Sequence, residues 1–99
     1  MTVRWTERAS ADLLGIGDYI AQDNPSAARA WVARLRLRAA KAAIAPRGGR
    51  VVPELGQENV REVFLRTYRI VYRVVDDGIV VLTIFEGHRL LGTVDTRNA

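Results

Sequence analysis

The stretch from residue 60 to residue 86 constrains the fold of this chain more than any other. It contains three consecutive segments with the alternating pattern typical of β-strands, at about 60–66, 68–75 and 79–86. The sequence 76-DDG-78 supplies a tight hairpin turn before the third segment. That third segment is apolar on both faces, which is typical of a central strand covered on both sides. Three antiparallel strands are therefore predicted here.

The chain begins with a short alternating segment, 2-TVRW-5, which predicts a first strand. Thr6 is a suitable N-cap, and apolar residues recur at helical spacing from there to about Gln22. Gly15 and Gly17 each weaken this helix by about 1 kcal/mol relative to alanine. Two glycines in one turn indicate the close approach of another backbone element.

The clearest boundary between two helices in the sequence is 23-DNPSAA-28. Asn24 is the expected N-cap of a second helix and Pro25 its first residue, since proline is favoured at that position. The helix is predicted to run to Ala45, because Pro46 cannot continue it. Only a few residues separate the two helices, so we expect them to pack as an antiparallel hairpin.

The second helix has two apolar stripes, about 170° apart at 100° per residue. The first consists of Ala28, Trp31, Val32, Leu35, Ala39 and Ala42. The second consists of Ala33, Leu37, Ala40 and Ile44. The first helix and the sheet would supply the two surfaces that such a helix needs; alternatively, one stripe stays open for a partner. We expect Trp31 and Leu35 to be buried beside Ile70 and Tyr72.

The predicted order is β-α-α-β-β-β, an α+β fold in which an N-terminal helical hairpin packs on one face of an antiparallel sheet. The 99 residues fit a single domain, 1–99. The chain has no cysteine, which excludes disulfides and fits a reducing cytosol. No apolar run approaches the roughly 20 residues that span a bilayer. We therefore expect a cytoplasmic protein without a membrane partner.

A lone histidine and the absence of any ligand-like Asp/Glu spacing predict no metal and no cofactor. The net charge is +4, and 14 of the 15 cations are arginine. Arginine suits phosphate and carboxylate groups, so a nucleic acid or an acidic protein is a plausible partner. A GC-rich genome that favours arginine codons would give the same composition.

Two arginines, Arg69 and Arg73, lie inside the segment 68–75. Because strand side chains alternate, both lie opposite an apolar set that belongs under the helices. That set is Tyr68, Ile70, Tyr72 and Val74. We therefore expect Arg69 and Arg73 to point to the uncovered side of the sheet.

Further basic residues precede and follow these strands. Arg61 lies on the strand before, and His88 and Arg89 follow the last strand. Together with Arg69 and Arg73 they predict a concave basic surface that binds anions. The alternative is cross-strand ion pairing with Glu62 and Glu86 and nothing more.

Several stretches resemble the RelE/ParE toxin superfamily of bacterial type II toxin–antitoxin modules. They are VRWTERASADLLGIGDYIAQDNPSAA near the start, the linker PRGGRVVPEL, then VREV, TYRIVYRV and GHRLL. Their order and spacing cover nearly the whole chain and are specific together. The resemblance implies a small β-α-α-β-β-β toxin neutralised by a cognate antitoxin whose extended segment wraps around it, with oligomers formed through the antitoxin.

The superfamily contains two activities. RelE-like members cleave messenger RNA in the ribosome, whereas ParE-like members poison DNA gyrase. For a nuclease, the resemblance implies catalytic roles for Arg69 within YRIVY, for Arg89 and approximately for Arg61. The tail 90–99 lacks the tyrosine that many such nucleases have, so His88 would have to move protons.

The helix opening and the PRGGRVVPEL linker resemble the ParE-like branch more closely, so we expect a gyrase inhibitor. Its target contacts would be Arg69, Arg73 and Arg89. The antitoxin contacts would lie on the second helix at Trp31, Arg34, Leu37 and Arg38. A ribosome-dependent endoribonuclease is the alternative, which leaves open whether the chain is an enzyme. A third possibility is a non-toxic nucleic-acid-binding module with strongly salt-dependent binding.

Overall fold

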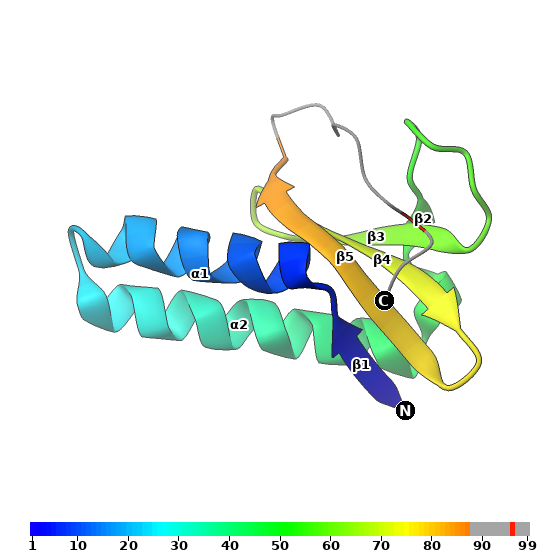
Figure 1. Ribbon diagram of the computed structural model, residues 1–99, viewed down its shortest axis with the longest axis horizontal. Coiled ribbons are helices and arrows are strands. Elements are labelled where there is room, and N and C mark those ends of the chain that lie inside the picture. Colours follow the sequence, from blue (N-terminus) through cyan, green and yellow to red (C-terminus); the bar gives the residue numbers. More distant parts are fainter. Residues whose placement is uncertain (88–95, 97–99) are drawn as a thin grey trace.

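The computed structural model describes residues 1–87 and 96. Its elements are β1 (Thr2–Trp5), α1 (Glu7–Ala21), α2 (Pro25–Ile44), the 3-10 helix η1 (Pro46–Gly48), β2 (Arg50–Val51), β3 (Val60–Leu65), β4 (Tyr68–Val75) and β5 (Gly78–Glu86). The strands form one sheet in the order β1-β5-β4-β3-β2. The α1–α2 hairpin packs on one side of this sheet and extends past it (Figure 1).

Both helices begin where the sequence predicts, because a side-chain oxygen satisfies an otherwise unpaired amide in each first turn. The Thr6 hydroxyl accepts from the Ala9 amide at 3.0 Å, and the Asn24 carboxamide accepts from the Ala27 amide at 3.1 Å. Pro25 is the first residue of α2. The predicted helical hairpin is confirmed.

The prediction of a purely antiparallel sheet is wrong, because β1 pairs in parallel with β5 from Thr2 opposite Gly78 to Trp5 opposite Val81. Strand β4 already occupies the other edge of β5. The chain between β1 and β5 contains the helical hairpin and strands β2 to β4, so it is long enough for the crossover that a parallel pairing requires. The short strand β2 was also missed, since two residues inside a Gly- and Pro-rich loop carry no readable alternation. The pairs β2–β3, β3–β4 and β4–β5 are antiparallel, as expected.

The main core lies between the helices and the sheet. Leu35 is fully buried there together with Ile70 and Tyr72, which confirms the predicted face of β4. Trp31 is only half-buried and meets Tyr68 edge-on at 5.8 Å between ring centroids. Its predicted place beside Ile70 and Tyr72 is wrong, because it lies about one helical turn before Leu35.

A second, smaller core covers the opposite face of the sheet. Its buried residues are Val52, Val60, Val71, Val80 and Leu82. Val52 and Leu55 come from the segment 52–59, which folds over this face before β3 begins. Strand β5 is therefore apolar on both sides for the predicted reason, and the face opposite the helices is not simply open.

The glycines of α1 differ in their surroundings. A Cβ at Gly17 would lie 3.0 Å from Val32 Cγ2, so α2 approaches α1 closely at this point. A Cβ at Gly15 would meet nothing within 4 Å. The expected close approach is confirmed for Gly17 and wrong for Gly15.

Helix α1 also completes the edge of β5 beyond the end of β1. The Ile84 amide donates to Asp12 Oδ2 at 3.2 Å, and the Thr83 hydroxyl donates to the same oxygen at 2.5 Å. An edge amide that lacks a strand partner is thus satisfied by a carboxylate from the helix.

Candidate functional site

Arg69 does not lie on an open basic surface. It points to the face opposite the helices, as predicted, but it is only 5% exposed. Its Nη1 and Nη2 donate to the two carboxylate oxygens of Glu54 at 2.9 Å each, and its Nε donates to Glu62 Oε1 at 2.7 Å. The alternative of cross-strand pairing is therefore confirmed for Glu62, and the uncovered position predicted for Arg69 is wrong.

The carboxylate of Glu62 is the centre of this network. Its side chain is fully buried and bridges Arg69 and Arg50, whose Nε lies 2.5 Å from Glu62 Oε2. Glu54 comes from the segment 52–59 and completes the charge balance around Arg69. The hydrogen bonds that Arg69 donates to Glu54 raise the pKa of Arg69, and its hydrogen bond to Glu62 and the charge of Glu62 add to this, despite the opposing effect of burial.

Phe85 closes the network from β5. The guanidinium carbon of Arg69 lies 5.0 Å from the centroid of the Phe85 ring. Arg69 thus links Glu54 of the segment 52–59 to Glu62 and Phe85 of the sheet. Its guanidinium is fully engaged within the fold.

Arg61 lies on the other side of the sheet. It is directly opposite Tyr72, and paired residues of neighbouring strands share a face. Its Nη1 donates to the carbonyls of Arg47 and Gly49 at 3.3 and 3.0 Å, and its Nε donates to the Glu58 carbonyl at 2.9 Å. Arg61 and Arg69 therefore do not form one concave surface.

Arg73 is less engaged than Arg69 and Arg61. It shares the face of Arg69, since the two are separated by two positions along β4. Its Nε is buried and has no hydrogen-bond partner among residues 1–87 and 96. His88 and Arg89, the remaining members of the predicted basic surface, lie outside the described residues.

The residues predicted for antitoxin binding come together on α2. Arg34, Leu37 and Arg38 line a groove of about 170 Å³ with Lys41 and with Leu65 of β3. Leu37 is 58% exposed, and the Arg34 guanidinium stacks over Trp31 at 4.6 Å from the ring centroid. The structure thus brings all four predicted residues into one neighbourhood.

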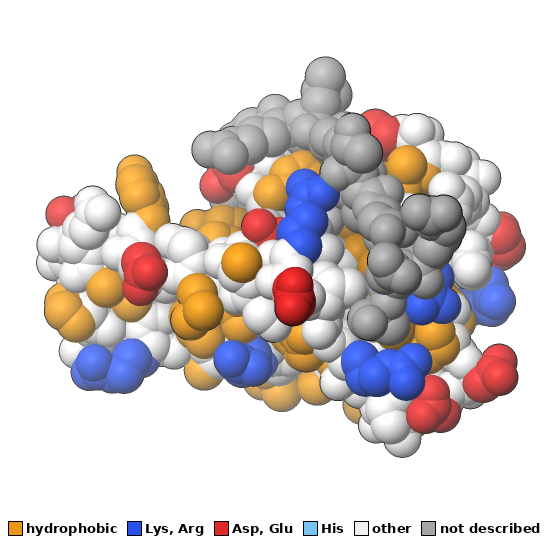
Figure 2. All heavy atoms as spheres, viewed as in Figure 1, with side chains coloured by type: hydrophobic (Ala, Val, Ile, Leu, Met, Phe, Trp, Pro, Cys, Tyr) orange, Lys and Arg blue, Asp and Glu red, His pale blue; other side chains and the backbone are white. Residues whose placement is uncertain are grey.

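The second apolar stripe of α2 is open to solvent, as the alternative interpretation of the sequence allowed. Ala33, Leu37, Ala40 and Ile44 are all exposed. We call these four residues the α2 ridge. Figure 2 shows Lys and Arg side chains spaced along the helical layer with hydrophobic side chains between them.

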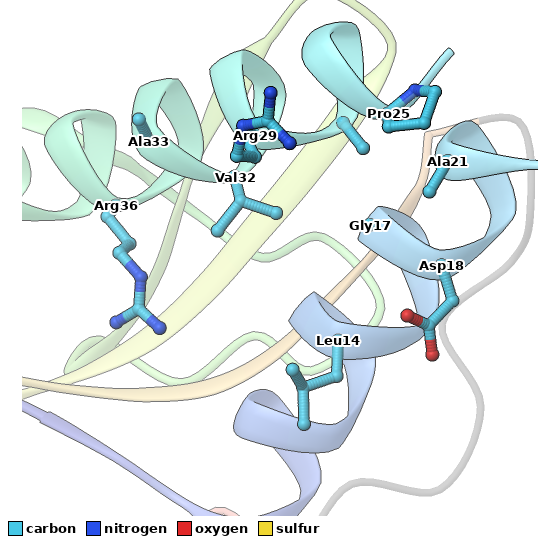
Figure 3. Close-up of a pocket in the computed structure, with 10 residues that line it drawn as sticks. Leu14, Gly17, Asp18, Ala21, Pro25, Arg29, Val32, Ala33 and Arg36 are labelled. Carbon is cyan, nitrogen blue, oxygen red and sulfur yellow. The ribbon is translucent and has the colours of Figure 1, made fainter.

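A second groove, which the sequence did not predict, lies between the two helices on the hairpin side of the ridge. It has a volume of about 460 Å³ and a mainly apolar lining. In Figure 3, Val32 of α2 points toward α1, Arg29 and Arg36 stand on either side of it, and Leu14 and Asp18 line the α1 side. Gly17, where α2 approaches α1 closely, lines this groove.

Within residues 1–87 and 96, no group of three or more His, Cys, Asp or Glu side chains is placed to hold a metal ion. In that same part of the chain, no helix has the length and apolar character needed to cross a membrane.

Comparisons with known proteins agree with this geometry. Residues 3–91 match the family described as ParE toxin of type II toxin–antitoxin system, parDE. The chain is 39% identical over 89 residues to Toxin RelE2 of Caulobacter vibrioides, covering 89% of this chain and 97% of that protein. A chain of the chromosomal ParDE system from P. aeruginosa superposes with a TM-score of 0.71 at 26% identity, over 87% of this chain and 95% of that one. This chain therefore belongs to the ParE toxin family, within the RelE/ParE superfamily of type II toxin–antitoxin systems.

Proposed function

We propose that this toxin inhibits DNA gyrase and does not cleave messenger RNA. The burial of Arg69 is the observation that carries the proposal. A cation that stabilises a reacting phosphate must be free to contact it. Arg69 would first have to leave Glu54 and the fully buried Glu62, and a buried carboxylate without its partner is costly.

The placement of Arg61 supports the same conclusion. A nuclease of this type would need several cations around one phosphate. Arg61 and Arg69 lie on opposite faces of the sheet, and Arg61 already donates to two backbone carbonyls. We assign Arg69 to holding the segment 52–59 in place and keep Arg73 as the strand residue available to a target.

The test uses the purified full-length chain in two assays. We expect it to block the supercoiling of relaxed plasmid by gyrase and to leave messenger RNA on translating ribosomes intact. Cleaved message with unaffected supercoiling would overturn the proposal in favour of the RelE-like nuclease. Salt-sensitive nucleic-acid binding without either effect would favour the non-toxic binding module.

A substitution of His88 distinguishes the two activities further. A gyrase inhibitor needs no proton transfer on the toxin, so His88→Ala is expected to leave toxicity in a bacterial host nearly unchanged. A nuclease that lacks the late tyrosine would depend on this imidazole for proton transfer, and the substitution would then reduce cleavage about 10²-fold or more.

We further propose that the cognate antitoxin binds the α2 ridge. On a helical wheel of about 100° per residue, cations border the ridge on both sides. Arg29 and Arg36 lie on one side, and Arg34, Arg38 and Lys41 on the other. An amphipathic helix with an apolar stripe between acidic residues matches this pattern, as in helix-in-groove recognition.

Neutralisation by an antitoxin is tested by expressing the chain alone and together with the neighbouring reading frame. We expect growth arrest in the first culture and growth in the second. A purified complex should contain both proteins and should assemble into oligomers through the antitoxin. Equal growth of the two cultures would remove the basis for a toxin of this kind.

A further inference from the structure

Two arginines, Arg4 of β1 and Arg73 of β4, lie on the sheet face opposite the helices. Both are in register with Val80 of β5, which separates them, and Val60 of β3 continues the row beyond Arg73. Residues paired across neighbouring strands share a face, and both valines belong to the second core. Figure 1 shows β1 and β4 on either side of β5. The row therefore crosses three adjacent strands and ends on a fourth.

The two arginines are the residues of this row that reach the surface. Val60 and Val80 are fully buried, whereas Arg4 is exposed and Arg73 is half-buried. Two strand spacings separate the arginines, so their Cα atoms lie about 9–10 Å apart. The sheet thus presents two cations at a separation that its hydrogen bonding fixes.

The fold balances neither of these charges. The Nε of Arg73 is buried, and among the described residues it has no hydrogen-bond partner, which destabilises a folded chain. In the same part of the chain, no hydrogen bond or ion pair engages the Arg4 side chain. The carboxylate of Glu62, on the same face, is already bound by Arg69 and Arg50. The pair is therefore left to bind an anion from outside the chain.

We propose that Arg4 and Arg73 bind phosphates of a DNA backbone, so that the toxin contacts the DNA of a gyrase–DNA complex as well as the enzyme. The guanidinium group is suited to phosphate. A separation of about 9–10 Å corresponds to about three steps of 3.4 Å along one DNA strand. The valines of the row offer no hydrogen bond to a base edge, so the contact is to the backbone and independent of sequence.

The position of the pair separates this contact from the antitoxin surface. The antitoxin segment proposed above binds the α2 ridge, and α2 packs on the other face of the sheet. Gyrase acts on DNA, so a toxin that inhibits gyrase meets the enzyme together with its DNA. The place of the contact rests on the proposed inhibition of gyrase, whereas the contact itself is measured without gyrase.

The first experiment measures the binding of the full-length chain to a fluorescein-labelled duplex of 20 base pairs by fluorescence anisotropy. We expect a dissociation constant on the order of 10⁻⁴ M at physiological salt, which is typical of sequence-independent binding. Two phosphate contacts contribute about −2 to the slope of log K against log[salt]. Binding should therefore weaken about tenfold or more between 50 and 200 mM salt.

Variants assign the contacts to the two arginines. Arg4→Gln and Arg73→Gln should each reduce the magnitude of the salt slope by about 1, and the double variant by about 2. Arg66→Gln is the matched control, because Arg66 is exposed in the turn between β3 and β4, outside this row. Arg4 is exposed on an edge strand, so Arg4→Gln keeps the test valid if Arg73→Gln does not fold.

The second experiment compares the inhibition of gyrase supercoiling by the same variants. We expect the double variant to need about tenfold more protein than the wild-type chain or Arg66→Gln. If the wild-type chain left supercoiling unaffected, the proposed function would fail, and anisotropy would still report the DNA contact. Equal DNA binding or equal inhibition by the double variant and the wild-type chain would overturn the proposal. So would an octaglutamate peptide that bound as tightly as the duplex and lost its binding in the double variant, since the pair would then recognise an acidic protein.

Discussion

The arginines of the sheet and those of α2 are used in opposite ways. Arg69 lies in the middle of a strand, is 5% exposed and binds two carboxylates of its own chain. Arg34 is exposed on α2 beside the open Leu37 and stacks over Trp31, whereas Arg38 is half-buried and donates from Nε to the Phe64 carbonyl at 3.2 Å. The strand arginine therefore holds the fold together by ion pairs, whereas the charges of the helix arginines face the side of α2 that is open to a partner.

This difference shows why charge alone is a poor guide to a site. A guanidinium inside a strand invites a functional interpretation, because the strand pattern gives no reason for it. The reason lies in Glu54 and Glu62, and only one of these two is on a neighbouring strand. The exposed Arg34 beside the exposed Leu37 is the more informative combination, because burial explains neither side chain.

The largest effect is expected from Arg69→Ala. The substitution leaves the fully buried Glu62 with Arg50 alone and releases Glu54 from the sheet. Breaking a buried ion pair on one side typically costs about 3–5 kcal/mol. We therefore expect a loss of this size in the free energy of unfolding, measured by urea denaturation.

Arg73→Ala is the matched control for Arg69→Ala. Arg73 lies on the same strand and the same face, yet its Nε has no hydrogen-bond partner in the described part of the chain. We expect its removal to cost clearly less than that of Arg69. Equal losses for the two variants would mean that the carboxylate network does not distinguish them.

The next effect compares the two sides of α2. Leu35 is fully buried, so Leu35→Ala should cost about 2–5 kcal/mol. Leu37 is 58% exposed, so Leu37→Ala should change the free energy of unfolding by less than about 0.5 kcal/mol. Thermal or chemical denaturation of both variants checks this, and a large loss for Leu37→Ala would show that the α2 ridge is covered by the chain itself.

Much of the fold was readable from the sequence because its signals are local. The caps at Thr6 and Asn24, the alternation along β4 and the apolar β5 each fix their own element. The parallel pairing of β1 was not readable, since it depends on which sheet edge remains free after β3, β4 and β5 have paired.

The candidate site was readable on the helix and misread on the sheet. The two stripes of α2 follow from helical geometry, so the open ridge could be stated as an alternative in advance. The burial of Arg69 depends on Glu54, which lies in a segment without periodicity and 15 residues away in the chain. Long-range ion pairs of this kind leave no pattern in a single sequence.

The third prediction concerns binding and not stability. Reversing two charges beside the ridge, in the double variant Arg34→Glu and Arg38→Glu, should weaken antitoxin binding about tenfold or more by like-charge repulsion. Arg34→Glu should change the free energy of unfolding by no more than about 0.5 kcal/mol, because Arg34 is exposed. Arg38→Glu also removes the hydrogen bond to the Phe64 carbonyl and should cost about 0.5–1.5 kcal/mol. Calorimetric titration of the antitoxin measures the affinity. Unchanged affinity at low salt would place the antitoxin elsewhere.

The smallest effect is expected at Glu58, whose carboxylate pairs with two arginines that differ in burial. Glu58, whose side chain is 75% exposed, pairs with Arg47 at 3.6 Å and with Arg61 at 2.5 Å. The Arg47 side chain is 58% exposed, so Arg47→Ala should change the free energy of unfolding by less than about 0.5 kcal/mol, and 1 M salt should remove even that change.

The Arg61 side chain is 13% exposed and also donates to the Arg47 and Gly49 carbonyls, so Arg61→Ala should cost about 1–3 kcal/mol. That larger loss should persist in salt, because it comes from backbone carbonyls left without a donor. If both losses disappeared in salt, charge and not burial would govern the arginines of this sheet, and the contrast between Arg69 and the α2 cations would lose its physical basis.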